Sequence, residues 1–213
     1  MSNLDMRLGY APDAFADVKG AALVHADPPW SYDRSERRGC AARHYFTITM
    51  GEISDHLDRA FDAAADDAYL ACWCTMPKLA EWFAASVAMR WTYITAGAWV
   101  KSGGIGVGYH WRGDSEILLL YRKGAPKPNN RKMSNAHVGP RERHSMKPVP
   151  FLRRVVSTFA LGDGPVLDIY AGLSPMAQAC RAERRDYIGI ECDEARRAEA
   201  LRLLGCAGDQ LWG

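Results

Sequence analysis

The stretch around Gly172 constrains the fold of this chain more than any other. A run at residues 166–169 that is apolar except for Asp168 is typical of a buried strand. It leads into a turn of mostly small residues, 170–174, and then to Pro175, which can open a helix. A second apolar run at residues 187–192 contains the acid Glu191. Strand, helix and strand at this spacing predict a βαβ unit, and therefore a parallel sheet of the Rossmann-like type.

Apolar runs alternate with helix-period segments along the rest of the chain, which is the pattern of an α/β sheet. Seven strands are expected, at residues 4–10, 21–26, 68–75, 92–101, 115–123, 165–170 and 187–192. Five helices are expected, at residues 52–65, 77–90, 148–159, 175–183 and 194–204. Neither an internal repeat nor a second folded unit is evident. We therefore expect one domain over residues 1–213, with a basic loop insertion at about 124–147.

The composition favours a soluble globular protein, with 48% hydrophobic and 24% charged residues. No stretch approaches the roughly 20 apolar residues of a membrane helix, and the first residues lack the features of a secretory signal. The six cysteines form no C-x-x-C pair and no cluster with zinc spacing. We expect a cytoplasmic protein, bacterial or phage-encoded, with reduced thiols and neither a bound metal nor a membrane partner.

A second constraint lies where the strand at residues 21–26 ends in Asp27-Pro28-Pro29-Trp30. Ligands of open α/β sheets bind at the carboxyl ends of the strands. Prolines stiffen the turn and leave carbonyls that only accept hydrogen bonds, and an ionised Asp also only accepts. The turn therefore suits an N–H donor beside a flat aromatic face, such as the exocyclic amino group of a nucleobase.

Charge is unevenly distributed along the chain. Residues 122–147 carry eight Lys or Arg against the single acid Glu142, which leaves a net charge of −5 on the rest. A basic segment on a mildly acidic body is typical of a protein with a polyanion partner, although it is also typical of a solvated loop. The two interpretations are compatible, because a basic loop can close over a nucleic acid.

These motifs resemble those of the MT-A70 family of adenine-N6 methyltransferases, and the likeness spans nearly the whole chain. The matching segments are NLDMR at 3–7, DPPW at 27–30, RHYFTITM at 43–50, WVK at 99–101, GVGY at 106–109, SEILL at 115–119, HSMKP at 144–148 and DIYAG at 168–172. The turn also resembles the D-x-F-x-G-x-G motif of S-adenosylmethionine-dependent methyltransferases. Tyr170 replaces its Phe and Ser174 its last Gly, which adds a side chain where the backbone approaches the cofactor.

The resemblance implies roles for individual residues. The catalytic turn would be Asp27, Pro28, Pro29 and Trp30. The residues implied to bind S-adenosylmethionine are Asp5, Met6, Asp27, Lys147, Asp168, Tyr170, Ala171, Gly172 and Glu191. Among them, Lys147 would bind the cofactor carboxylate, and Glu191 would accept bonds from the ribose hydroxyls. The residues expected to contact the nucleic acid are Trp30, Tyr32, His44, Tyr45, Arg141 and Arg143.

The order of the motifs has a structural consequence. The catalytic strand precedes the cofactor strand, so the resemblance implies a circularly permuted fold whose seven-stranded, mostly parallel sheet has one antiparallel strand. Residues 4–10 should then fill the sheet position beside the strand that ends at Glu191. The turns after residues 26 and 169 should lie at a common edge, and His25 is expected to be a satisfied core or pocket-wall residue.

Three functions stay open on the sequence. The first is methyl transfer to adenine N6 in nucleic acid, with DNA favoured over RNA. The second is a catalytically inactive, methyltransferase-like subunit that binds nucleic acid; the intact DPPW argues against it, whereas Ser174 is compatible with it. The third is methylation of cytosine N4 or a side-chain amide, which Asp27 and Trp30 together disfavour. Oligomerisation is possible and the sequence does not decide it.

Overall fold

The computed structural model describes residues 2–9, 13–31, 47–103, 110–141 and 146–205. Its centre is an eight-stranded sheet in the order β1-β8-β7-β2-β3-β5-β4-β6. The strands are β1 (Leu4–Leu8), β2 (Ala21–Ala26), β3 (Ala64–Cys74), β4 (Thr92–Ser102), β5 (Ser115–Lys123), β6 (Ala136–Pro140), β7 (Val166–Asp168) and β8 (Tyr187–Glu191). Only β5 runs against its neighbours, as predicted.

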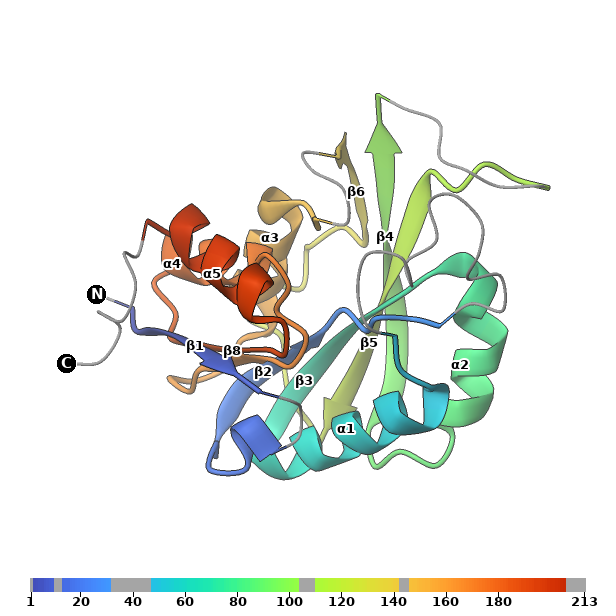
Figure 1. The fold of residues 1–213 in the computed structure, drawn as a ribbon. Helices are drawn as coiled ribbons and strands as arrows, with labels where there is room; N and C mark the ends of the chain where they lie inside the picture. The colour runs from blue at the N-terminus through green and yellow to red at the C-terminus, as the bar shows by residue number, and fades with distance from the viewer. Residues whose placement is uncertain (1, 10–12, 32–46, 104–109, 142–145, 206–213) are drawn as a thin grey trace.

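Helices cover both faces of this sheet (Figure 1). They are α1 (Met50–Ala63), α2 (Leu79–Ser86), α3 (Val149–Phe159), α4 (Pro175–Ala182) and α5 (Glu194–Leu203). Apolar side chains of α3, α4 and α5 form one core cluster with the sheet, and those of α1 and α2 form the other. The central strand β2 is buried along its whole length between these two layers, which explains its uninterrupted apolar sequence.

The predicted count of seven strands is wrong, because the basic segment contains β6. This strand pairs in parallel with β4, from Ala98 opposite Ala136 to Ser102 opposite Pro140. Its sequence, AHVGP, has little apolar alternation and ends in a proline, so the sequence pattern favoured a loop. Proline is tolerated there because β6 is the last strand of the sheet.

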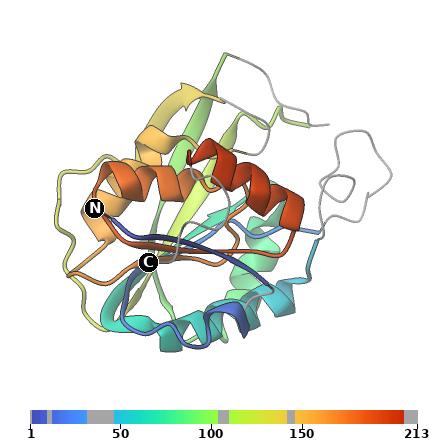
Figure 2. The same cartoon turned by 60° about the vertical axis from the view of Figure 1, so that its left-hand side comes forward.

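The first strand takes the predicted position. β1 pairs in parallel with β8, with Leu4 opposite Tyr187 and Leu8 opposite Glu191. Figure 2 shows the two strands side by side, although they come from opposite ends of the chain. Arg197 Nε of α5 donates to the carbonyl of Met6 at 2.7 Å, which ties the same strand to the helical layer.

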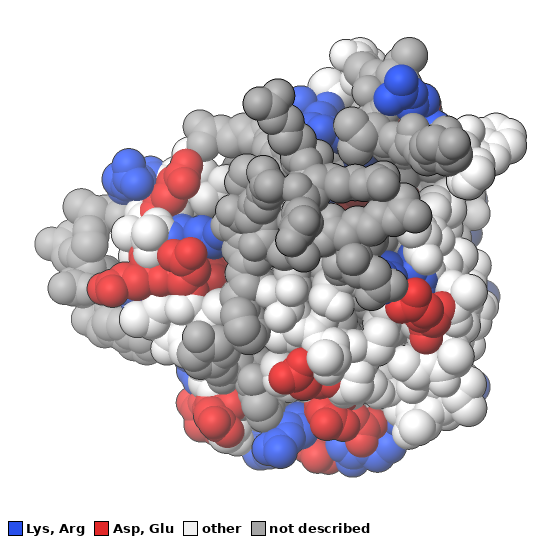
Figure 3. Space-filling model, turned by 45° about the vertical axis from the view of Figure 1, so that its right-hand side comes forward, with Lys and Arg blue, Asp and Glu red and all other residues white. Residues whose placement is uncertain are grey.

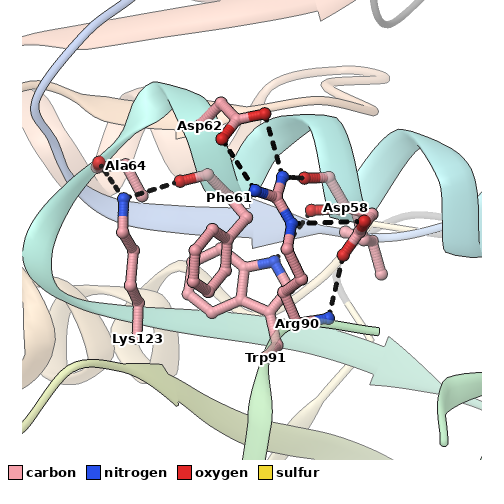
Figure 4. A network of polar contacts seen from close by, with 8 residues as sticks. Asp58, Phe61, Asp62, Ala64, Arg90, Trp91 and Lys123 are labelled. Atoms are coloured by element: carbon pink, nitrogen blue, oxygen red, sulfur yellow. Dashed lines mark hydrogen bonds and ion pairs between the residues drawn. The ribbon is translucent and has the colours of Figure 1, made fainter. Parts of the chain in front are cut away.

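Two helices differ from their predicted bounds for local reasons. α1 begins earlier, because Thr49 and Glu52 form a capping box. Its other end is held by Lys123, whose Nζ donates to the carbonyls of Phe61 and Ala64 at 2.8 and 2.9 Å, while Phe61 lies between Lys123 and Arg90 (Figure 4). α2 is shorter than predicted: a 3-10 turn, η3 (Met76–Lys78), precedes it and the helix ends at Ser86.

Three of the described cysteines, Cys72, Cys74 and Cys180, are buried and unpaired, and they act as small apolar side chains. Cys192 follows β8 and is exposed, so its predicted place inside an element is wrong. No helix in the described ranges combines the length and the apolar character needed to cross a membrane.

Candidate active site

The DPPW turn follows directly on β2 and is held by its own backbone. Trp30 N donates to the Pro28 carbonyl at 2.9 Å, and Ile48 N donates to the Pro29 carbonyl at 3.2 Å. The Trp30 ring is 5% exposed and meets Trp82 of α2 edge to face, with the ring centroids 5.5 Å apart. Trp30 therefore anchors the turn to the core. A role as a stacking surface for a base stays a prediction.

The acid of this turn is part of an ion-pair cluster. Lys147, just before α3, donates from Nζ to Asp27 Oδ2 at 2.6 Å, and the same Nζ lies 3.1 Å from Glu116 Oε2. The other Glu116 oxygen pairs with Lys101 at 2.5 Å. Two carboxylates and two ammonium groups thus alternate along one chain of contacts, and three of the four side chains are less than 20% exposed.

The contacts within this cluster shift the pKa values of its members. Burial alone raises the pKa of Glu116, but Lys147 and Lys101 outweigh burial and lower that pKa to about 2. Burial alone lowers the pKa of Lys147, but Asp27 and Glu116 raise that pKa above its usual value. Burial raises the pKa of Asp27, and the charge of Lys147 offsets only part of this rise. The pKa values of both Asp27 and Glu116 therefore depend on the charge of Lys147.

The turn after β7 has the backbone geometry that its glycine suggests. Gly172 has φ 54°, and a side chain placed on it would meet no atom within 4 Å, so space is open beside its backbone. Its N–H donates to Glu191 Oε2 at 2.8 Å, and Asp193 N donates to Glu191 Oε1 at the same distance. Glu191 thus fixes this turn, and each oxygen keeps a further lone pair for another donor.

Ser174 does not obstruct the turn. Its side chain is completely buried, and Oγ donates to the sulfur of Met6 at 3.1 Å. The hydroxyl therefore points toward the core beneath β1. Serine at this position strains the backbone instead. Ser174 has φ 54°, a conformation that glycine adopts more easily.

The two turns lie at the same sheet edge, as predicted. β2 and β7 are parallel neighbours with His25 opposite Asp168, and Ile169 N donates to the His25 carbonyl at 3.1 Å. From β7 the chain passes through α4 to β8, whereas from β2 it passes through α1 to β3 on the other side. The direction of winding changes between β7 and β2, which is where ligands bind in open α/β sheets.

A buried polar network joins these strands. His25 Nδ1 lies 2.9 Å from Asp168 Oδ1, and Tyr187 Oη donates to Asp168 Oδ2 at 3.1 Å. Trp73 of β3 donates from its indole N–H to His25 Nε2 at 3.0 Å. All four side chains are at most 2% exposed. Asp168 therefore has both oxygens engaged within the core, and His25 is the satisfied core residue that was expected.

The remaining predicted cofactor residues differ in what they contact. Asp5 is buried in β1, where Oδ2 accepts from Arg7 Nε at 2.8 Å and Oδ1 has no hydrogen-bond partner among the described residues. Tyr170 bonds through its hydroxyl to His56 of α1 at 2.8 Å. Ala171 N donates to the Ile190 carbonyl. Asp5 thus has one acceptor to spare, whereas the Tyr170 side chain and the Ala171 amide help to hold the turn.

The predicted nucleic-acid contacts are placed only in part. Tyr32, His44, Tyr45 and Arg143 lie outside the described residues. Arg141 directly follows β6 and is exposed, at the edge to which the parallel strands bring their carboxyl ends. The role of each of these residues stays a prediction.

The described basic residues between positions 122 and 147 do not form one patch. β5 runs antiparallel and delivers the chain to the edge opposite Asp27. There Ala125 N bonds to Asp67, and Asn129 N bonds to the Thr158 carbonyl. β6 then returns the chain to the Asp27 edge. Lys127, Arg131 and Lys132 therefore lie in the segment that turns at the far edge. On the face in Figure 3, acidic and basic side chains lie side by side at the left, right and bottom, and small groups of basic ones lie at the top.

Sequence reasoning missed the roles of Glu116, Lys101 and Trp73. Glu116 and Lys101 lie on adjacent strands, with Trp99 opposite Glu116, so Lys101 is a diagonal neighbour on the same face. A Lys at the end of one predicted strand and a Glu at the start of the next were the available signal. Among the described residues, no group of three or more His, Cys, Asp or Glu side chains is placed to hold a metal ion.

The family model N6_N4_Mtase, described as DNA methylase, matches residues 21–202. No curated protein sequence matches the chain.

Three solved structures share the fold at low sequence identity. The M1.HpyAVI complex with S-adenosylmethionine has a TM-score of 0.73 at 16% identity, over 94% of this chain and 99% of that one. The PvuII cytosine-N4-specific DNA methyltransferase has a TM-score of 0.76 at 11% identity, over 94% and 86%. TTHA0409 of Thermus thermophilus, described as a candidate DNA modification methylase and solved with S-adenosylmethionine, has a TM-score of 0.71 at 16% identity, over 96% and 93%.

Proposed function

Because the chain belongs to the DNA methylase family of N6 and N4 methyltransferases, we propose that it transfers a methyl group from S-adenosylmethionine to the N6 amino group of adenine in DNA. The observation that carries the proposal is the place of Asp27. This acid follows β2, next to the open glycine turn of β7 and in contact with Lys147. A hydrogen-bond acceptor for an amine and a backbone turn for a nucleoside thus lie at one edge.

The residues present fit S-adenosylmethionine. Gly172 leaves open space beside the turn, as a nucleoside lying against the backbone requires. Lys147 is a buried cation that can bind a carboxylate, and Asp5 has a buried oxygen to which no described residue donates. Glu191 can accept from hydroxyls through its remaining lone pairs. When bound, this cofactor supplies an electrophilic methyl group on a positively charged sulfur. Structures of two proteins with this fold contain it.

Asp27 and the Pro28 carbonyl would each accept one N6–H hydrogen bond. Adenine N6 is a weak nucleophile, because its lone pair is delocalised into the ring. Two acceptors favour a pyramidal nitrogen whose lone pair points away from them. The Pro28 carbonyl already accepts from Trp30 N, and its second lone pair is available for this bond. Holding the amine in one orientation removes much of the entropic part of the barrier.

Asp27 also suits the proton that N6 loses after transfer. Burial raises the pKa of Asp27 above its ordinary value, so the carboxylate is a better proton acceptor than an exposed one. The target base must leave its stack, which costs about a few kcal/mol. The residues that would receive it are Trp30, Tyr32, His44 and Tyr45, with Arg141 and Arg143 on the DNA backbone.

Two finer points belong to the same proposal. The strand that leads to Asp27 precedes the strand with Asp168 in the chain, which supports a circular permutation relative to common methyltransferases. An acid, rather than a serine, at position 27 supports adenine over cytosine as the target. The PvuII enzyme, whose target is cytosine N4, shares this fold, so the target base needs a direct test.

That test is a nucleoside analysis. The purified chain is incubated with S-adenosylmethionine and either duplex DNA or single-stranded RNA, and the digested nucleosides are examined by mass spectrometry. N6-methyladenine from DNA, absent with Asp27→Ala, is the expected result. N4-methylcytosine would overturn the adenine assignment, and methylation of RNA alone would overturn the DNA assignment. Binding of nucleic acid with no methylated nucleoside would favour the inactive subunit.

A further inference from the structure

We propose that His25 is a positioning residue for the proposed methyl transfer. In this role it fixes the Trp73 indole beneath Lys147, and so keeps Lys147 between Asp27 and Glu116. The inference rests on the proposed function, because it concerns the same site. It adds a residue that lies two positions before Asp27 and touches none of the reacting atoms.

The hydrogen bonds of His25 define a single tautomer. The Trp73 indole N–H can only donate, so His25 Nε2, at 3.0 Å, must be an unprotonated acceptor. Nδ1 therefore carries the proton and donates to Asp168 Oδ1 at 2.9 Å. Asp168 is held from its other side by the Tyr187 hydroxyl. The imidazole is thus neutral, buried and bonded at both nitrogens.

Trp73 depends on this acceptor for its orientation. Its other ring contacts are edge-to-face packing against Trp99 and Phe151, with centroids 6.4 and 5.9 Å away. Such packing allows more freedom than a hydrogen bond between two ring nitrogens. The bond to His25 is therefore the directional contact that sets where the face of the indole points.

Lys147 lies over that face. Its Nζ is 5.2 Å from the centroid of the Trp73 ring, within the range of a cation–π interaction. An indole whose N–H is bonded to an acceptor is polarised, which strengthens its attraction for a cation. The same Nζ is 2.6 Å from Asp27 Oδ2. A shift of the indole would thus weaken the cation–π contact that holds the Lys147 ammonium group beside Asp27.

Two amide substitutions separate the halves of this network. His25→Gln can place its amide oxygen where Nε2 accepts from Trp73, at the expense of the bond to Asp168. His25→Asn can place its amide N–H where Nδ1 donates to Asp168, at the expense of the bond to Trp73. Each variant loses one buried hydrogen bond and keeps one, so a purely structural role predicts similar effects for both.

The positioning role predicts different effects. For His25→Gln, kcat/KM for methyl transfer should stay within about threefold of wild type, whereas His25→Asn should lose about tenfold or more.

The pH profile is the second readout. The charged groups that act on Asp27 are Lys147 and Glu116, and the neutral imidazole of His25 and the thiol of Cys72 also face it. If Lys147 is displaced, the pKa of Asp27 rises further, so the acid limb of kcat/KM moves to higher pH in His25→Asn only.

The binding and spectroscopic readouts do not need turnover. Calorimetry with S-adenosylhomocysteine should give weaker binding for His25→Asn than for His25→Gln. The Trp73 indole N–H resonance should stay near its wild-type position in His25→Gln and move in His25→Asn. In a Trp73→Phe background, which has no indole donor, the difference between the two His25 variants should disappear.

The outcomes distinguish this inference from the proposed function. Equal loss in both variants, or a persistent difference in the Trp73→Phe background, would overturn the positioning role of His25. An inactive wild-type protein would overturn the proposed function instead. In that case the indole resonance and the binding of S-adenosylhomocysteine would still report on the His25 network.

Discussion

Lys147 and Asp27 meet in an ion pair of 2.6 Å across 120 residues of sequence. The acid closes the turn after β2 and the ammonium group directly precedes α3, so the pair joins the central strand to the helical layer that packs on it. Glu116 shares the same ammonium group at 3.1 Å. The position of one lysine therefore determines how much negative charge Asp27 presents to a donor.

Asp27→Ala should abolish methyl transfer, because the acceptor for the target amine is lost. Affinity for S-adenosylhomocysteine should change by only a few fold, since Lys147, Gly172 and Glu191 remain. Radiolabelled methyl incorporation and calorimetry measure the two quantities. Asp163→Asn, at an exposed position, is the control for a change of charge. Full activity of Asp27→Ala would contradict the proposed mechanism.

Lys147→Met should weaken cofactor binding by about tenfold or more, the usual worth of a charge-assisted hydrogen bond to a carboxylate. It also removes the ammonium group that pairs with the carboxylates of Asp27 and Glu116. Circular dichroism must therefore show that the variant is folded. Calorimetry with S-adenosylhomocysteine gives the dissociation constant. Lys127→Met, in the segment at the far edge, should bind like wild type. An unchanged constant for Lys147→Met would remove this residue from the cofactor site.

Glu116→Gln should change how stability depends on pH. The pKa of Glu116 is lowered from 4.5 to about 2 on folding. Its contribution is therefore present above about pH 4.5 and is lost as the pH falls through about 2. The full effect is on the order of 3 kcal/mol. Urea unfolding between pH 2 and 6 should show a shallower loss of stability in Glu116→Gln than in wild type. The exposed Glu194→Gln should follow wild type; an equally steep curve for Glu116→Gln would contradict the ion-pair cluster.

Ser174→Gly and Ser174→Ala test the strained turn before α4. Both lose the contact with the Met6 sulfur, but only glycine relieves the positive φ of this position. The free energy of unfolding should be about 0.5–1 kcal/mol higher for Ser174→Gly than for Ser174→Ala. This difference already allows for the greater freedom of glycine in the unfolded chain, which lowers the gain. Urea unfolding of the pair measures this difference. Greater stability of Ser174→Ala would show that the backbone is not strained there.

Much of the fold could be predicted because its central strands are short apolar runs with clear turns. β2, β7 and β8, the pairing of β1 with β8, and the single antiparallel strand all follow from these runs and from the order of the motifs. β6 could not be predicted, because its sequence has little apolar alternation and ends in Pro140, and its stability comes from pairing with β4. The span of the basic segment was misleading, because β6 carries the chain across the sheet between Lys132 and Arg141.

The site was predictable in its backbone but not in its side-chain partners. The glycine turn and the DPPW turn are each recognisable from a few consecutive residues. The contact of Lys147 with Asp27, by contrast, depends on how α3 packs on β2 and β3, which no local pattern records. Likewise, Ser174 looked like an obstruction in sequence because the direction of its side chain depends on a positive φ. Tertiary packing, rather than composition, decides such contacts.

The pairing of β1 with β8 has a consequence for how the protein is made. Asn3 bonds to Asp186 across 183 residues, so β1 leaves the ribosome well before its partner β8 and has to wait for it. At about 5–20 residues per second, that interval is roughly ten seconds or longer. During it, Leu4 and Met6 are apolar side chains without a partner, which a chaperone could bind. Pairing of β1 with β8 is therefore a late step of folding, and it depends on contact between two strands that are far apart in the sequence.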